Sequence, residues 1–191
     1  AAGRTINPWD VIKQDAPMTE HELSISGKGE KMTYYLSGSF TSQKSPLVGD
    51  QFKRLSVRAN FDLHVTDWLE IGTNSSFATK DYSGAEANWG DAARLSPYSS
   101  IRYDDGTLRK LPYGDGMVSN PLWNVEMKDN KEISYGIFNN NFMIIKLPLK
   151  GLTYQMNLSN NLRFKDINNY EIFVKNNSLG DLEYKLFDSI K

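Results

Sequence analysis

The sequence predicts an all-β chain: a segment of an antiparallel, up-and-down transmembrane β-barrel, with about six to seven long strands arranged as hairpins and one long extracellular loop that contains a short helix. Three observations support this class. Apolar and polar residues alternate over runs of about a dozen residues, whereas strands in soluble domains average about 5–6. The alternation recurs along the chain, and short connections alternate with long ones. Because a tilted strand needs about 9–11 residues to cross a bilayer, runs of this length favour membrane-spanning strands.

The clearest strand covers residues 54–65, where one face is fully apolar and the other fully polar. Residues 31–41 repeat the pattern. Residues 152–164 repeat it again, with only Asn160 interrupting the apolar face. The apolar face of the first of these strands is formed by Leu55, Val57, Ala59, Phe61, Leu63 and Val65.

Two further strands are predicted from weaker patterns, over residues 69–79 and 133–147. In the second, Asn139 and Asn141 share a face with Ile137 and Met143, while Phe138, Phe142 and Ile144 occupy the other face. Residues 20–26 and 170–175 are short flanking candidates. These elements bring the expected number of strands to six or seven.

The connections differ in length in a regular order. Residues 27–30, 66–68 and 148–151 are short and rich in Gly, Pro and polar residues, which suit tight turns. Residues 42–50 form an intermediate link, and residues 81–131 and the polar segment after 166 form long ones. Bacterial outer-membrane barrels place short turns on the periplasmic side and long loops outside. Residues 1–18 and 81–131 are therefore expected to be extracellular loops.

Composition excludes several classes of function. The 191 residues contain 22 Lys and Arg against 23 Asp and Glu, so no strong field attracts nucleic acid. Cysteine is absent, and the two histidines, His21 and His64, have no ligand partners at suitable spacing, so we expect no metal and no cofactor. We find no nucleophile elbow, zinc motif or acid pair, so no catalytic residue is predicted and the chain is not expected to be an enzyme.

The long loop is the place where recognition is most expected, because loops carry binding residues on a rigid scaffold. Residues 86–95 predict a short helix, and residues 101–110 predict a small hairpin that turns at 104–106. Flat aromatic faces beside hydrogen-bonding groups suit a sugar or a peptide. The alternative is that these side chains pack the loop against the barrel rim. The candidate substrate-binding residues are Trp89, Arg94, Tyr98, Arg102, Tyr103 and Trp123.

Short motifs in order along the chain carry a family resemblance. Asn7-Pro8-Trp9-Asp10-Val11-Ile12 begins the series, Phe52-Lys53-Arg54-Leu55 and Trp68-Leu69-Glu70-Ile71-Gly72 follow, and Asn120-Pro121-Leu122 and Lys150-Gly151-Leu152 complete it. In sequence and spacing these motifs resemble the barrel of SusC/RagA-like TonB-dependent transporters. The resemblance implies that residues 1–191 are part of a single TonB-dependent receptor β-barrel domain, whose plug domain and remaining strands are absent from this chain.

The same resemblance implies a function: import of oligosaccharides or peptides across the outer membrane of a Gram-negative bacterium. The implied partners are a SusD-like surface lipoprotein, TonB (through segments not present here), the glycan or peptide substrate and outer-membrane lipid. The alternative function is that of a soluble secreted β-sandwich carbohydrate-binding module, which should show strands of about 5–6 residues around a core filled from two sheets.

Overall fold

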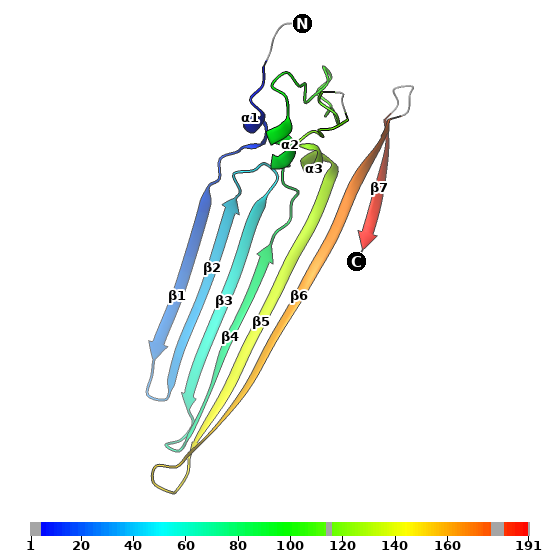
Figure 1. The fold of residues 1–191 in the computed structure, drawn as a ribbon. Helices are drawn as coiled ribbons and strands as arrows, with labels where there is room; N and C mark the ends of the chain where they lie inside the picture. Colours follow the sequence, from blue (N-terminus) through cyan, green and yellow to red (C-terminus); the bar gives the residue numbers. More distant parts are fainter. Residues whose placement is uncertain (1–4, 114–115, 177–181, 191) are drawn as a thin grey trace.

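The computed structural model describes residues 5–113, 116–176 and 182–190, and shows one antiparallel sheet of seven strands in the order β1-β2-β3-β4-β5-β6-β7. Each strand pairs with its neighbour in sequence, so the topology is up-and-down (Figure 1). The predicted all-β fold class is confirmed. The strands are β1 (Met18–Lys28), β2 (Met32–Lys44), β3 (Gln51–His64), β4 (Leu69–Asp81), β5 (Lys128–Lys146), β6 (Thr153–Asn176) and β7 (Leu182–Ile190).

The strand register aligns the apolar residues of successive strands into one continuous face. Ile25 lies opposite Leu36, and Leu36 lies opposite Ala59; residues directly opposite each other share a face. This apolar face is exposed to the surroundings, and Leu23 is 80% exposed and Leu158 58%. The sheet is a single layer, so its apolar face needs a covering from outside the described chain. That arrangement differs from the β-sandwich alternative.

Beyond residue 164 the structure corrects the sequence-based prediction. The prediction of a long polar link after residue 166 is wrong, because β6 continues without a break to Asn176. The short candidate strand over residues 170–175 is part of β6. A strand of 24 residues spans roughly 80 Å at about 3.3 Å per residue, far more than a bilayer requires. In the extra length both faces mix charged or polar residues with apolar ones, so alternation no longer marks the strand. Ion pairs join β5 and β6 there: Lys131 to Asp166 (2.9 Å) and Lys165 to Glu132 (2.8 Å).

The weak alternation in β4 and β5 also has a physical cause. Asn139 Nδ2 donates to Ser75 Oγ (2.6 Å) and to Thr73 Oγ1 (3.2 Å), and Asn141 donates to the Asn139 side-chain oxygen. We call Thr73, Ser75, Asn139 and Asn141 the polar cluster. Its register places it on the apolar face, opposite Phe61 on β3 and Leu158 on β6. Side chains that satisfy one another's hydrogen bonds can lie on an apolar face at reduced cost.

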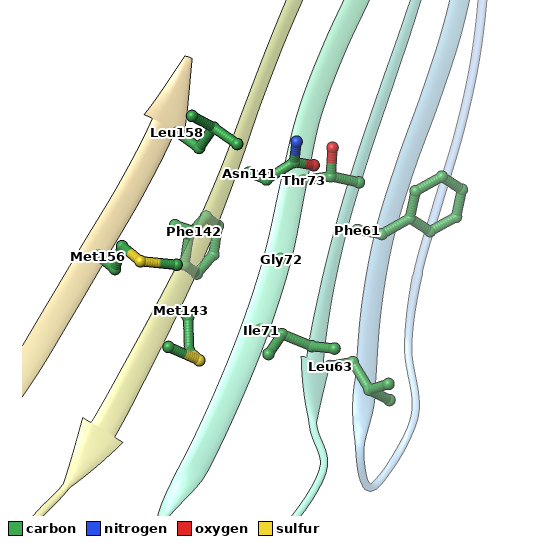
Figure 2. A pocket seen from close by; sticks show the side chains of 10 residues that line it. All are labelled: Phe61, Leu63, Ile71, Gly72, Thr73, Asn141, Phe142, Met143, Met156 and Leu158. Carbon is green, nitrogen blue, oxygen red and sulfur yellow. The ribbon is translucent and has the colours of Figure 1, made fainter.

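Next to the polar cluster the apolar face is hollowed. A hollow of about 460 Å³ crosses β3, β4, β5 and β6 there. Its apolar lining residues, labelled in Figure 2, are Phe61, Leu63, Ile71, Met143, Met156 and Leu158. On the opposite, polar face the Phe142 ring covers Gly72, and a Cβ at Gly72 would collide with that ring. This explains why Phe142 departs from the alternation: its ring fills the space that a side chain at residue 72 would take.

The two ends of the sheet are different. Residues 29–31, 65–68 and 147–152 form the short turns at one end, and the longer connections gather at the other (Figure 1). We call residues 5–17, 45–50, 82–113 and 116–127 the cap. It contains α1 (Pro8–Ile12), α2 (Trp89–Arg94) and α3 (Trp123–Met127). Among the described residues, no helix is both long and apolar enough to cross a membrane.

Candidate functional site

The cap holds the tightest packing in the described part of the chain. Ile12, Ala87 and Ala92 are buried together, and partly buried Val11, Leu47, Val48, Leu122 and Val125 pack against them. These residues come from connections that are far apart in sequence. The cap is therefore one packed unit rather than several independent loops, which the sequence did not indicate.

Backbone hydrogen bonds tie the parts of the cap to one another. Val48 N donates to Ile12 O, and Ala87 N donates to Val48 O, both at 2.8 Å. Gln14 Nε2 donates to the carbonyl oxygens of Ser45 (3.0 Å) and Leu47 (2.9 Å). The sequence predicted no helix at Pro8–Ile12, although the signal is present in retrospect. Asn7 caps it by accepting from Trp9 N, and Pro8 stands in the first turn, where a missing N–H costs nothing.

The predicted helix over 86–95 is confirmed in a shorter form as α2. Asn88 caps it by accepting from Asp91 N at 3.0 Å, and the preceding residues 86–88 are extended or irregular. The small hairpin over 101–110 is also confirmed, with one bridge between Arg102 and Leu108. At its turn, Thr107 donates from Oγ1 (2.6 Å) and from N (2.9 Å) to Asp105, and these bonds lower the pKa of Asp105.

Asn120 is the central polar residue of the cap. Its side chain is buried, with 1% exposed, and Nδ2 donates to Ile101 O (2.7 Å) and Arg109 O (2.8 Å). Its Oδ1 accepts from Leu122 N at 3.0 Å. One amide therefore joins both strands of the small hairpin to the start of α3. The sequence analysis used Asn120 only as part of a family motif and did not assign it this role.

Two glycines allow another close contact in the cap. Gly49 and Gly84 both have positive φ, at +89° and +139°. A Cβ at Gly49 would collide with Ala85 O, and a Cβ at Gly84 would collide with Gly49 O. The backbone of the β2–β3 connection thus lies directly against the start of the long loop.

Both arginines among the candidate substrate-binding residues are held within the cap. Arg94 Nη2 pairs with Asp91 at 2.9 Å, one turn earlier in α2. Arg102 pairs with Glu126 of α3 and also donates to Gly106 O at 3.1 Å. These partners fix the guanidinium groups in place and occupy part of their donor capacity.

The four aromatic candidates differ in their surroundings. Trp89 and Tyr98 present their rings to the outside, with 62% and 73% exposed. Arg109 lies over the Tyr103 ring at 4.4 Å, and Lys110 lies over the Trp123 ring at 5.4 Å. The structure therefore separates two outward aromatic residues from two that carry a cation on their faces.

The described residues contain no cluster of three or more His, Asp or Glu that could hold a metal ion. Two buried polar atoms in the cap, Ser99 Oγ and Arg109 Nε, have no hydrogen-bond partner within the described chain. Arg109 belongs to the small hairpin, and Ser99 lies two residues before it in the sequence.

Sheet and cap together define a class of protein: an antiparallel barrel wall of long strands, with short turns at one end and a packed loop unit at the other. No family model matches the chain. Sequence comparison finds TonB-dependent receptors of Formosa agariphila: receptor P26 is 26% identical over 139 residues, and receptor P39 is 24% identical over 169 residues. These matches cover 72% and 86% of this chain but only 14% and 16% of the relatives.

Structure comparison finds the RagAB peptide importer. Its open-open state aligns over 90% of this chain and 20% of the neighbour, with a TM-score of 0.75 and 20% identity; its closed-closed state gives 0.74 and 21%. The chain thus spans less than a quarter of each of these proteins. It is similar, over a segment of barrel wall, to SusC/RagA-like TonB-dependent transporters, as its motifs predicted.

Proposed function

We propose that the chain is part of a TonB-dependent importer in the outer membrane of a Gram-negative bacterium, where it supplies barrel wall and extracellular loops. The observation that carries this proposal is the exposed apolar face, which runs across six long strands and is covered by no second layer within the described residues. Lipid covers such a face at no cost, because apolar side chains belong in hydrocarbon. The fold and relatives of the chain support this function over that of a soluble carbohydrate-binding module.

In this proposal the apolar face contacts outer-membrane lipid, and the opposite, polar face lines the barrel interior. Residues 1–18 and 81–131 lie outside the cell, and the short turns face the periplasm. The strands β5 and β6 then project beyond the bilayer on the outer side. The cargo is an oligosaccharide or a peptide, and the chain acts in transport rather than as an enzyme.

The cap is the proposed contact surface for cargo and for a SusD-like surface lipoprotein. Of the candidate residues, Trp89 and Tyr98 are the best placed to stack on a ligand, because their rings are the most exposed. Arg94 and Arg102 contribute by holding the cap in shape. TonB acts through parts of the receptor outside this chain.

Membrane fractionation with a growth assay tests the proposal. The full protein should fractionate with the outer membrane and require detergent for extraction, and deletion of its gene should abolish growth on one peptide or glycan. A protein that stays monomeric in buffer without detergent, or a deletion strain that grows normally on every cargo tested, would contradict it.

A further inference from the structure

The polar face of the sheet carries a second hollow, of about 350 Å³, close to the cap. Three cations border it: Arg54 on β3, Lys80 on β4 and Arg163 on β6. We call it the basic hollow. Its floor is made of small residues on β4 and β5, and Phe138, Asn161 and Tyr82 complete the wall. None of these lining residues is acidic.

The register sets two of the cations against each other. Arg54 lies directly opposite Lys80, so their Cβ atoms are about 5 Å apart on the same face. Like charges directly opposite one another destabilise a sheet. Arg163 lies opposite Gly136, next to Ala78 on β4, so small side chains leave open space between it and the other two cations. An anion in that space would relieve the repulsion.

The neighbouring acids are engaged elsewhere or lie farther away. Glu132, at the same end of β5, pairs with Lys165 at 2.8 Å. Asp81, beside Lys80 in sequence, accepts from Ser83 N at 2.9 Å and belongs to the opposite face of β4. Glu20 and Glu22 share the polar face but are on β1, separated from β3 by the whole of β2.

Arg54 is held in an orientation suited to a ligand. Its Nε donates to Ser56 Oγ at 2.9 Å, which fixes the plane of the guanidinium group and leaves its terminal nitrogens as donors. A planar guanidinium pairs with a carboxylate through two parallel hydrogen bonds, and a second arginine and a lysine add to the attraction. The aromatic wall at Phe138 and Tyr82 supplies an apolar surface for the rest of the ligand.

We propose that the basic hollow binds a carboxylate of the transported molecule, so that the cargo is an acidic oligomer. This inference rests on the proposed function, because the polar face lines a transport path only if the sheet is part of a barrel. The position of the hollow, near the cap end of β3 and β4, makes it an early binding site for cargo that enters from outside.

Binding measurements on the full protein in detergent test the inference with matched ligands. One pair is a hexaglutamate peptide and its hexaglutamine analogue; the other is an oligogalacturonate and its methyl ester. At least one acidic member should bind about tenfold or more tightly than its neutral analogue, and the preference should weaken as salt is raised. The pair that responds identifies the source of the carboxylate.

The double variant Arg54→Gln, Arg163→Gln should bind acidic and neutral members equally and should be at least as stable to heat as the parent, because it removes a like charge opposite Lys80. Lys146→Gln is the matched control, since Lys146 shares the polar face but lies beside a short turn at the opposite end. Equal binding within both pairs by the parent protein would overturn the inference, as would a double variant that keeps the preference or changes only stability. If the protein is absent from the outer membrane, the proposed function fails first; if it is present and imports cargo without regard to charge, only this inference fails.

Discussion

Replacement of Asn120 by Asp should open the cap locally. The substitution keeps the shape of the side chain but removes both Nδ2 donors, so the carbonyl oxygens of Ile101 and Arg109 lose the bonds of 2.7 and 2.8 Å that Nδ2 donates and face a carboxylate instead. Ile101 O keeps the bond that it accepts from Arg109 N, so only Arg109 O is left without a partner, at a cost of about 1–3 kcal/mol, and the negative charge beside both carbonyl oxygens adds to that cost. The bond that Oδ1 accepts from Leu122 N survives the change.

Hydrogen exchange measures this effect residue by residue. The amides of Arg109 and Asn120, which donate to Ile101 O and Lys110 O, should exchange at least about fivefold faster, since 1–2 kcal/mol corresponds to a factor of about 5–30. Amides in the β2–β3 ladder should be unchanged. Asn88→Asp is the matched control, because a carboxylate serves equally well as the N-cap of α2. If the Arg109 amide of the variant exchanged within a factor of about three of the parent rate, the conclusion that Asn120 holds the small hairpin to the start of α3 would be refuted.

Three further outcomes follow from the contacts. Gly49→Ala should destabilise the cap by more than about 1–2 kcal/mol, the conformational cost of a non-glycine residue in the left-handed region, because its Cβ also collides with Ala85 O. Gly106→Ala, at a similar φ of +87° but with open space around it, should cost only that conformational part. Limited proteolysis compares the stability of the two variants. Asn139→Asp should lower the free energy of unfolding by urea, measured in lipid vesicles, by about 1–3 kcal/mol, because Ser75 and Thr73 lose the hydrogen bonds that Asn139 Nδ2 donates. Asn157→Asp, on the polar face, should have almost no effect. Equal effects of the two substitutions would contradict the placement of the polar cluster. Thr107→Val should raise the pKa of Asp105 toward its ordinary value of 3.8, because the Thr107 hydroxyl no longer donates to the carboxylate. In the parent, the lowered pKa stabilises the folded turn above pH 3.8, and this stabilisation is lost as the pH falls through the pKa of the folded state. A carboxyl NMR titration that shows no rise in the variant would exclude the hydroxyl as a cause.

The sequence predicted the parts of the fold in which one face is apolar and the other polar. Residues 54–65 alternate fully, and β3 covers nearly the same span. Alternation could not define the ends of β5 and β6, because both faces of that projection carry polar residues such as Lys131 and Lys165. The hydrogen bonds of Asn139 and the packing of Phe142 over Gly72 depend on neighbouring strands, so the weak pattern of β5 could be explained only from the register.

The binding role of the candidate residues stays a prediction, and the organisation of the loop that carries them could not be predicted from the sequence. The long loop does carry exposed aromatic rings at Trp89 and Tyr98, as expected. The sequence did not show that Arg94 and Arg102 are committed to ion pairs, since their partners Asp91 and Glu126 are recognised only in the folded loop. Nor could it show the basic hollow, whose cations are far apart in sequence and meet through pairing across the strands.

Because the cap shares one hydrophobic core among three segments, the recognition surface that we propose on it is a joint property of all three. Exchange of the long loop alone with that of a related receptor would leave Ile12 and Val48 against an unmatched partner. Ligand preference should therefore be transferable between receptors only when the three segments are moved as a set, and natural divergence in cargo should proceed by concerted changes at sites widely separated along the gene.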